Sequence, residues 1–212
     1  MKRNPNLWVV PKIWQDGECF ILGGGPSLSQ VNLEPLKCKR CLAVNNAFKL
    51  GDWIDAMFFG DCRWYGWEGK NLLNFAGLKV TTCERHIEKP GIKVVQRKNA
   101  PYGISSDPGL LFWNLSSGAC AINLAVHFGV KRIVLLGFDM KTDGVKHNYH
   151  NDYPDMNDPA PTRHDPNARY VRFMKPFVQI AEDLKRLNVE CLNATEGSAL
   201  TVFPMVRLED VV

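Results

Sequence analysis

Short runs of apolar residues alternate along the chain with longer segments in which apolar residues recur at helical spacing. A short apolar run bounded by turn residues is typical of a strand buried in a parallel sheet. Recurrence at every third or fourth position is typical of a helix with one apolar face. The pattern predicts helices over 116–129 and 169–187, a short helical turn from Pro26, and strands over 18–22, 40–45, 54–60, 78–83, 92–96, 131–137 and 189–192.

The order of these elements predicts an α/β fold with a doubly wound, mostly parallel sheet. With 212 residues, the chain suits a single domain over 1–212 better than two domains. Two segments lack an apolar period. Residues 98–113 are rich in Gly, Pro and Ser and predict a loop, whereas residues 139–168 are rich in Asp, Asn, His and Pro and predict a long lid or insert.

Composition narrows the function classes. Lys and Arg exceed Asp and Glu by four, but they are scattered along the chain. This excess suits a small anionic substrate such as a nucleotide and is too weak to indicate nucleic-acid binding. No run approaches the about 20 apolar residues of a membrane span, and the first residues lack the apolar core of a signal peptide. We therefore expect a cytoplasmic protein, and its oligomeric state stays open.

Seven cysteines are present, which is an odd number. Because no secretory signal precedes them, we expect them to be reduced thiols. Cys38 and Cys41 have the CxxC spacing of some zinc sites. A zinc ribbon would need a second such pair, which the sequence lacks, so this spacing does not indicate a metal site.

A glycine-rich loop directly follows the first predicted strand, with Gly23, Gly24 and Gly25 ahead of Pro26 and Ser27. Glycines allow a sharp turn and a close approach of backbone to a ligand. Backbone N–H groups at the start of the following helical turn favour a phosphate, and Ser27 adds a hydroxyl donor. The spacing is neither GxGxxG nor a Walker motif. The loop predicts a nucleotide-phosphate site, and a plain strand-to-helix turn is the alternative.

Polar residues also stand at three other element ends. Asn45 and Asn46 end the second strand, Asp61 follows the third, and Ser117 with Gly118 opens the first long helix. An Asn amide can pair with a base or a ribose, a carboxylate can hold a ribose hydroxyl, and a helix start can bind a second phosphate. Turn formation and helix capping are the structural alternatives. Because strand ends meet at one sheet edge, we expect these residues to share the donor site.

The predicted lid concentrates groups suited to proton transfer: Asp139, Asp143, His147, His150 and His164. Histidine near a carboxylate is suited to general acid and base catalysis near neutral pH. We expect one of the three histidines to be catalytic together with Asp139, and the sequence does not decide which. Asp139 and Asp143 can alternatively ligate a divalent cation such as Mg²⁺.

Four motifs occur in an order that resembles the MptE-like family: GGGPSL, SSGACAINLAVHFGVKRIVLLGFDM, TDGVKH and LNATEGSAL. Named archaeal members of that family are 6-hydroxymethylpterin pyrophosphokinases, and relatives occur among motility accessory factor glycosyltransferases. A similar order of GxGPSL, Asn and Ser-Gly is found in single-domain bacterial sialyltransferases that use a CMP-sugar. The resemblance covers roughly residues 20–200.

The resemblance implies a Rossmann-like domain with a donor nucleotide across the strand ends. It places donor phosphate on the glycine loop, the nucleotide beside Asn46, and the donor beside Ser117 and Gly118. Asp61 stands where the sialyltransferases have an Asn, and Gly24 also replaces an Asn of theirs. Asp139 matches the GxDL step of the MptE-like proteins, and a lid histidine would be the base.

Three functions follow from these residues. The first is a glycosyltransferase that uses a nucleotide-sugar donor resembling a CMP-sugar, with a lid histidine as base. The second is a Mg²⁺-dependent pyrophosphokinase that transfers diphosphate from ATP to a hydroxymethyl heterocycle. The third is a non-catalytic nucleotide-binding accessory protein. Fold resemblance alone does not choose among them.

Overall fold

The computed structural model describes residues 4–142, 147–150, 152–153 and 168–212. His164 and Asp143, both predicted site residues, lie outside this part of the chain. The fold is built on a seven-stranded sheet in the order β5-β4-β3-β2-β1-β8-β9, in which every neighbouring pair is parallel. Its strands are β1 (Glu18–Leu22), β2 (Cys41–Val44), β3 (Ala56–Phe59), β4 (Leu78–Thr81), β5 (Ile92–Val94), β8 (Arg132–Leu136) and β9 (Glu190–Asn193).

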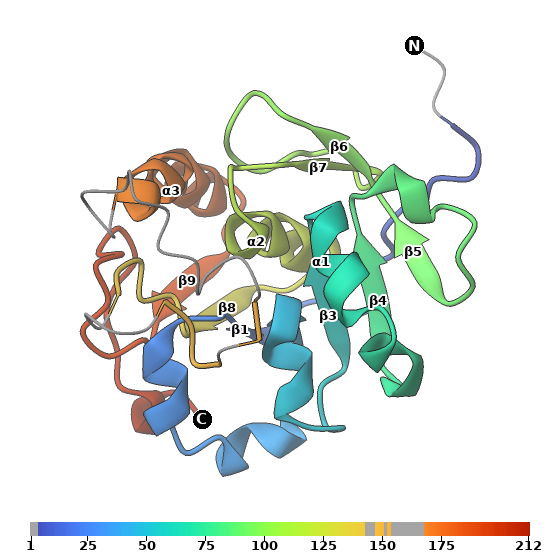
Figure 1. The fold of residues 1–212 in the computed structure, drawn as a ribbon. Coiled ribbons are helices and arrows are strands. Elements are labelled where there is room, and N and C mark those ends of the chain that lie inside the picture. The colour runs from blue at the N-terminus through green and yellow to red at the C-terminus, as the bar shows by residue number, and fades with distance from the viewer. Residues whose placement is uncertain (1–3, 143–146, 151, 154–167) are drawn as a thin grey trace.

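Helices cover both faces of this sheet, as Figure 1 shows. Alternate residues of each strand point to opposite faces, so Ile21 packs in one core and Phe20 in the other. The Ile21 face is covered by α2 (Ser117–His127) and α3 (Ala168–Arg186). The Phe20 face is covered by α1 (Cys62–Glu68) and by short 3₁₀ helices, among them Pro26–Gln30, Glu34–Cys38, Asn45–Leu50 and Asn71–Asn74. The predicted doubly wound α/β fold is thereby confirmed.

The strand order reverses between β1 and β8. From β1 the chain proceeds outward through β2 to β5, and from β8 it proceeds to β9 on the other side. In open α/β sheets, ligands bind at such a switch point, outside the carboxyl ends of the strands. The glycine loop follows β1 and Asp139 follows β8, so the topology brings these two predicted site segments together.

The structure differs from the prediction over residues 92–112 and directly after β3. The strand expected over 92–96 ends at Val94, and Gln96–Lys98 forms β6, which pairs with β7 (Leu110–Phe112) in a separate two-stranded sheet. Residues 98–113 therefore contain a strand in addition to the predicted loop. Helix α1 was not predicted, because its seven residues, CRWYGWE, are too short and too rich in aromatic residues and glycine to show a helical period.

Cys62 and Cys83 form a disulfide, with Cα atoms 5.6 Å apart. The expectation that all seven cysteines are thiols is therefore wrong for these two. The pair was missed because 21 residues separate it in sequence and only the pairing of β3 with β4 brings the two strand ends together. The other five cysteines are free, and among them only Cys38 is exposed. Burial raises the pKa of Cys19, Cys41, Cys120 and Cys191, which makes these thiols unreactive.

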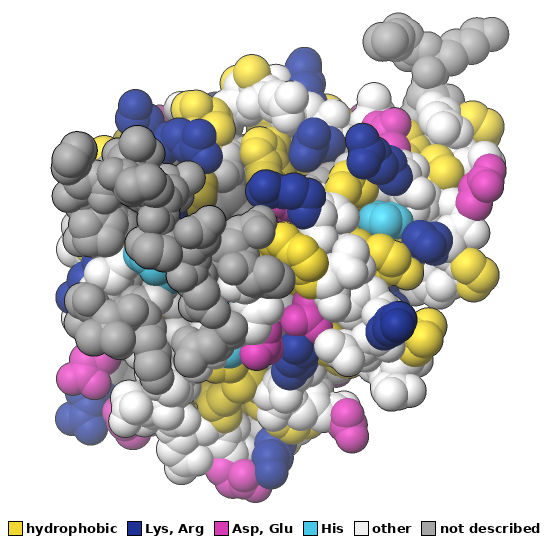
Figure 2. All heavy atoms as spheres, viewed as in Figure 1, with side chains coloured by type: hydrophobic (Ala, Val, Ile, Leu, Met, Phe, Trp, Pro, Cys, Tyr) yellow, Lys and Arg dark blue, Asp and Glu magenta, His cyan; other side chains and the backbone are white. Residues whose placement is uncertain are grey.

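Figure 2 shows Lys and Arg side chains spread over one face of the molecule among acidic and apolar ones. This distribution agrees with the scattered charges of the sequence, and the absence of nucleic-acid binding stays a prediction. In the described ranges, no helix combines the length and the apolar character that crossing a bilayer requires.

Candidate functional site

A cleft of about 300 Å³ lies over the carboxyl ends of the central strands. Four strands contribute the residues that follow them, namely β1, β2, β3 and β8, and the starts of α2 and α3 complete the walls. Predicted site residues that line the cleft are Gly23, Gly24, Gly25, Asn45, Asp61, Ser117, Gly118, Asp139 and His147. The structure thus brings most of the predicted residues around one opening at the switch point of the sheet.

The glycine loop is packed tightly against the end of β8. A Cβ atom at Gly23 would overlap the carbonyl of Gly137, and one at Gly25 would overlap the carboxylate of Asp139. Both glycines are therefore required by the close approach of the two strand ends. Gly24 has more room, because its nearest neighbour would be Asn148 Oδ1 at 3.3 Å.

The donors of this loop are used within the protein. Gly23 N–H donates to Leu136 O (2.7 Å) and Gly25 N–H to Gly137 O (2.8 Å). Ser27 donates through both its N–H (3.0 Å) and its hydroxyl (2.9 Å) to Asp139. The loop was expected to aim free donors at a phosphate, but its Gly23, Gly25 and Ser27 donors hold the end of β8 instead.

Asp139 takes the place that an anion would occupy on such a loop. Its side chain is buried, and burial raises its pKa, although the two bonds from Ser27 act in the opposite direction. Both carboxylate oxygens accept a hydrogen bond from Ser27, so Asp139 joins the ends of β1 and β8. Among the described residues, no group of three or more His, Cys, Asp or Glu side chains is placed to hold a metal ion. These contacts do not fit Asp139 as a ready Mg²⁺ ligand.

The start of α2 offers donors to the cleft. Ser116 is the N-cap, and its hydroxyl accepts the N–H of Ala119 (3.2 Å). Ser117 and Gly118 are the first two helical residues, whose N–H groups have no partner inside a helix. Within the part of the chain that the structure describes, no other acceptor bonds these two N–H groups. The positive end of the helix dipole adds to their attraction for an anion.

The adjacent residues Asn45 and Asn46 have different environments. Asn45 lines the cleft with a positive φ of 52°, and its side-chain Oδ1 is buried without a hydrogen-bond partner among the described residues. Asn46 is buried away from the cleft, and its side chain bonds Trp64 Nε1 (2.6 Å), Glu68 (2.9 Å) and Asp152 (3.1 Å). Asn45 is therefore the better placed of the two to contact a ligand.

Asp61 lies at the rim of the cleft and caps α1. Its carboxylate accepts the N–H of Arg63 (2.9 Å) and forms an ion pair with the Arg63 side chain (2.9 Å). Burial would raise the pKa of Asp61, but the bonds and charge of Arg63 outweigh it and lower the pKa. Asp61 is thus a charged carboxylate at the site, and contact with a ribose stays a prediction.

The two described lid histidines differ in position. His147 lines the cleft, with Tyr170 Oη 3.4 Å from its Nδ1, and the Tyr170 hydroxyl donates to the backbone O of His147 (3.2 Å). His150 does not line the cleft; its side chain is only 9% exposed and its Nδ1 accepts the N–H of Asp152 (3.2 Å). Burial lowers the pKa of His150. Geometry therefore favours His147 over His150 as the histidine that meets a substrate.

Two features of the site were missed from the sequence. One is an aromatic wall, and the other is a network that fixes residues 147–150 and 152–153, which we call the histidine segment. Trp113, Tyr153, Tyr170 and Phe173 line the cleft without belonging to a motif. Behind them lies a group that we call the Lys49 network. Lys49 Nζ contacts Glu68 (2.8 Å) and Asp152 (2.9 Å), and Asn46 bonds the same two carboxylates.

The histidine segment is also attached to the cleft floor. Tyr149 donates its N–H to Gly24 O (3.0 Å) and its hydroxyl to Asn46 O (2.7 Å). The bonds of Tyr149, and those of Asp152 to Asn46 and Lys49, connect residues more than 100 positions apart in sequence. No local pattern could have indicated them.

The arrangement of the sheet and its helices has known counterparts. A MAf glycosyltransferase from Magnetospirillum magneticum AMB-1 superposes with a TM-score of 0.60 at 13% sequence identity, over 95% of this chain and 37% of that one. The sialyltransferase CstII from Campylobacter jejuni, solved with cytidine-5'-monophosphate, superposes with a TM-score of 0.54 at 14% identity, over 89% of this chain and 84% of that one. The fold is shared with glycosyltransferases.

A second structure of the sialyltransferase, in complex with a trisaccharide acceptor and CMP, gives a TM-score of 0.50 at 13% identity, over 89% of this chain and 85% of that one. The chain therefore spans most of the sialyltransferase but little more than a third of the MAf protein. No family model and no characterised protein matches the sequence itself. At these identities the similarity establishes the Rossmann-like fold, and the resemblance to the MptE-like family stays a prediction.

Proposed function

We propose that this chain is a glycosyltransferase that binds a nucleotide-sugar donor, resembling a CMP-sugar, in the cleft at the switch point. The observation that carries the proposal is the convergence there of the unpaired N–H groups of Ser117 and Gly118, an aromatic wall and His147. Support comes from the shared fold, because two solved structures of the sialyltransferase with this fold contain CMP. The placement of each residue toward a donor is part of the proposal.

In this mechanism the leaving phosphate is bound by the start of α2. The N–H groups of Ser117 and Gly118 and the positive helix end stabilise the negative charge that develops as the glycosyl bond breaks. Asn45 Oδ1 is a buried acceptor in the same cleft and suits a donor hydroxyl or amine. The ring faces of Trp113, Tyr153, Tyr170 and Phe173 suit the planar base or the apolar face of a sugar.

His147 is proposed to remove the proton of the acceptor hydroxyl. Because Tyr170 donates its hydroxyl proton to the His147 carbonyl, its oxygen is left to accept from Nδ1 of the ring. That pairing favours the tautomer with hydrogen on Nδ1, which leaves Nε2 as the basic nitrogen. Tyr170 thus orients the base, as a third group does in other proton-transfer sites.

The proposal is tested by ligand-induced stabilisation with CMP, CDP, UDP, GDP, ADP and ATP, each with Mg²⁺ and with EDTA. A ligand at about 100 times its Kd stabilises the folded protein by about 2.7 kcal/mol. We expect CMP to raise the unfolding temperature with EDTA present. Stabilisation by ATP alone, and only with Mg²⁺, would instead favour the pyrophosphokinase.

Two histidine variants test the base in a transfer assay with a CMP-sugar. Replacing a general base costs about 10²–10⁴-fold in rate, so His147→Gln should lose turnover and still be stabilised by CMP. His150→Gln should keep more turnover than His147→Gln. The assignment fails if His147→Gln turns over at the wild-type rate, and the enzyme hypothesis fails if wild type binds CMP but transfers no sugar from any donor.

A further inference from the structure

A second and larger cavity, of about 610 Å³, lies at the other end of α2. Helix α2 begins at the cleft with Ser117 and ends at this cavity with Val126 and His127. Helix α3 also runs from the cleft to the second cavity, because Tyr170 near its start lines the cleft and Leu187 just after its end lines the second cavity. The two cavities are therefore separate, and the proposed transferase does not use the second one.

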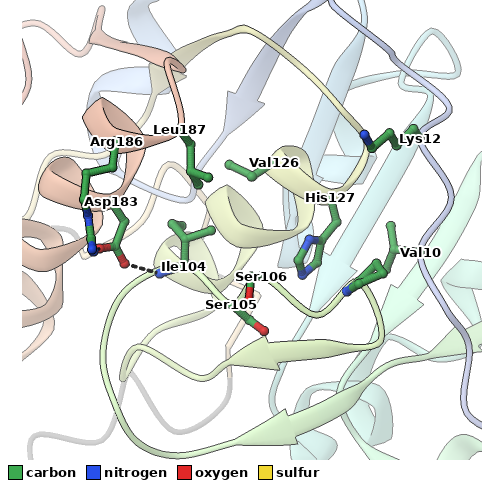
Figure 3. A pocket seen from close by; sticks show the side chains of 11 residues that line it. Val10, Lys12, Ile104, Ser105, Ser106, Val126, His127, Asp183, Arg186 and Leu187 are labelled. Carbon is green, nitrogen blue, oxygen red and sulfur yellow. Dashed lines mark hydrogen bonds and ion pairs between the residues drawn. The ribbon is translucent and has the colours of Figure 1, made fainter.

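Apolar side chains form the walls of the second cavity. In Figure 3, Leu187 and Val126 point toward one another above Ile104, and Val10 lies beside His127. The segments come from the N-terminal chain, the loop before β7, α2 and the end of α3. A volume of this size is within the range of sites that enclose a small organic molecule.

Buried polar groups hold one wall of this cavity in place. Asn123 Oδ1 accepts the N–H of Ser105 (3.1 Å), Asp183 Oδ2 accepts the N–H of Ile104 (2.7 Å), and His127 Nε2 lies 3.0 Å from Leu110 O. Asn123, His127 and Asp183 are all less than 9% exposed. Buried polar side chains are costly unless their bonds are satisfied, so these contacts fix the loop in one conformation. The cavity is preformed.

Two cations line the second cavity, and one of them has no ion-pair partner among the described residues. Asp183 is fully engaged, because it accepts from Ile104 and Gln179 and pairs with Arg186. Lys12, in contrast, has no ion pair with any described residue. In Figure 3, Lys12 and Arg186 lie on opposite sides of the cavity. A ligand with one negative charge near Lys12 would complement this arrangement.

The carbonyl groups at the helix ends do not oppose such a ligand strongly. At the end of α2, Val126 O accepts the N–H of Gly129 (2.9 Å) and Phe128 O accepts that of Trp14 (2.8 Å). At the end of α3, Leu184 O accepts the N–H of Val189 (2.9 Å). These acceptors are capped by the protein's own backbone.

We propose that the second cavity binds a small amphipathic carboxylate, with its charged group at Lys12 and its apolar body between Ile104, Val126 and Leu187. The charge selects an acid over an amine, and the apolar walls supply most of the affinity. The binding site is independent of the proposed transferase.

The probes are octanoate, octanol and octylamine, which share an apolar chain and differ in charge. Each is titrated into the full chain labelled with ¹⁵N, and amide shifts of residues 104–106, 126–127 and 186–187 report the site and the Kd. We expect octanoate to bind at these residues most tightly of the three. Lys12→Gln should weaken octanoate by about fivefold, the upper end for an exposed ion pair, and leave octanol unchanged.

Two variants complete the test. Lys70→Gln removes an exposed lysine that lines neither cavity and should bind octanoate like wild type. Leu187→Trp fills the cavity from a half-exposed position and should abolish the shifts, with the rest of the spectrum confirming the fold. The proposal is overturned if none of the probes shifts these amides at millimolar concentration, if octylamine binds as tightly as octanoate, or if Lys12→Gln has no effect.

Discussion

His86 is a buried histidine with no hydrogen bond to either ring nitrogen within the described chain. Its ring centre lies 4.2 Å from that of Tyr65 and 5.9 Å from that of Phe59. Burial lowers its pKa, and the neighbouring charges of Lys89 and Arg85 lower it further. The ring therefore acts as a neutral aromatic side chain in the packing between α1 and the end of β4.

Replacing His86 with Phe should make the protein less sensitive to mild acid. The pKa of His86 is lower in the folded chain than the about 6.5 of an unfolded one, so the unfolded state takes up the proton first. Its contribution to stability is lost as the pH falls through the unfolded value. Urea unfolding at pH 7.5 and 5.5 should show a smaller difference for His86→Phe than for wild type. An unchanged difference would contradict this account.

For single residues, the sequence predicted the position correctly where the order of elements places the residue at a strand end. Gly24, Ser117 and Asp139 were placed at one sheet edge by the element order alone, and the structure puts all three around the cleft. The role of Asp139 was not predictable, because its bonds to Ser27 join residues 112 positions apart. A tertiary contact of this kind decides whether a glycine loop keeps its donors free.

Among the elements, α1 shows how a short helix can carry a large structural role. It is capped by Asp61 and buries Trp64 and Glu68. Glu68 accepts bonds from Asn46, Lys49 and Asn71, so the helix is joined to the histidine segment through the Lys49 network. Asp61 caps this unpredicted helix, and its contact with a ligand stays a prediction.

Removing the charge of Glu68 should destabilise the protein and alter its acid response. Burial would raise its pKa, but bonds from Lys49, Asn71 and Asn46 outweigh burial and lower it. A carboxylate with a lowered pKa stabilises the fold above its unfolded pKa of about 4.3, and this contribution is lost as the pH falls through the folded value. Glu68→Gln should lower the free energy of unfolding, measured with urea, by about 1–3 kcal/mol at pH 7. The substitution should have little effect once the pH is below the folded pKa of Glu68.

Glu34→Gln is the matched control for Glu68. Glu34 pairs with Lys37 at the surface, where both side chains are more than half exposed, so its loss should change the unfolding free energy by less than about 1 kcal/mol. Equal effects of the two substitutions would show that the Lys49 network does not stabilise the fold.

In the whole molecule, a parallel sheet places the carboxyl ends of all seven strands at one edge, and the cleft is formed there. The disulfide joins the first residue of α1 to the segment after β4 at this same edge. The doubly wound, mostly parallel sheet followed from the alternation of elements. The disulfide did not, because a cysteine count carries no information on which strand ends are neighbours.

Thiol counting should give five free cysteines in the denatured, unreduced protein and seven after reduction. In the native protein only Cys38 should react quickly, because burial keeps the other four thiols protonated and covered. A peptide map without reductant should link the Cys62 and Cys83 fragments. Seven thiols before reduction, with the protein folded, would show that this bond is not formed in solution.

The Cys62–Cys83 bond makes the backbone on one side of the cleft more constrained than the backbone on the other side. On one side, Asp61 is adjacent to a covalent crosslink that pins the backbone. On the other, Tyr170 and Phe173 project from the first turns of α3, which packs on the sheet through apolar side chains and contains no cysteine for such a crosslink. Evolution or engineering toward a bulkier substrate would therefore meet least resistance on the α3 side, where trimming the ring of Phe173 enlarges the space without straining the main chain.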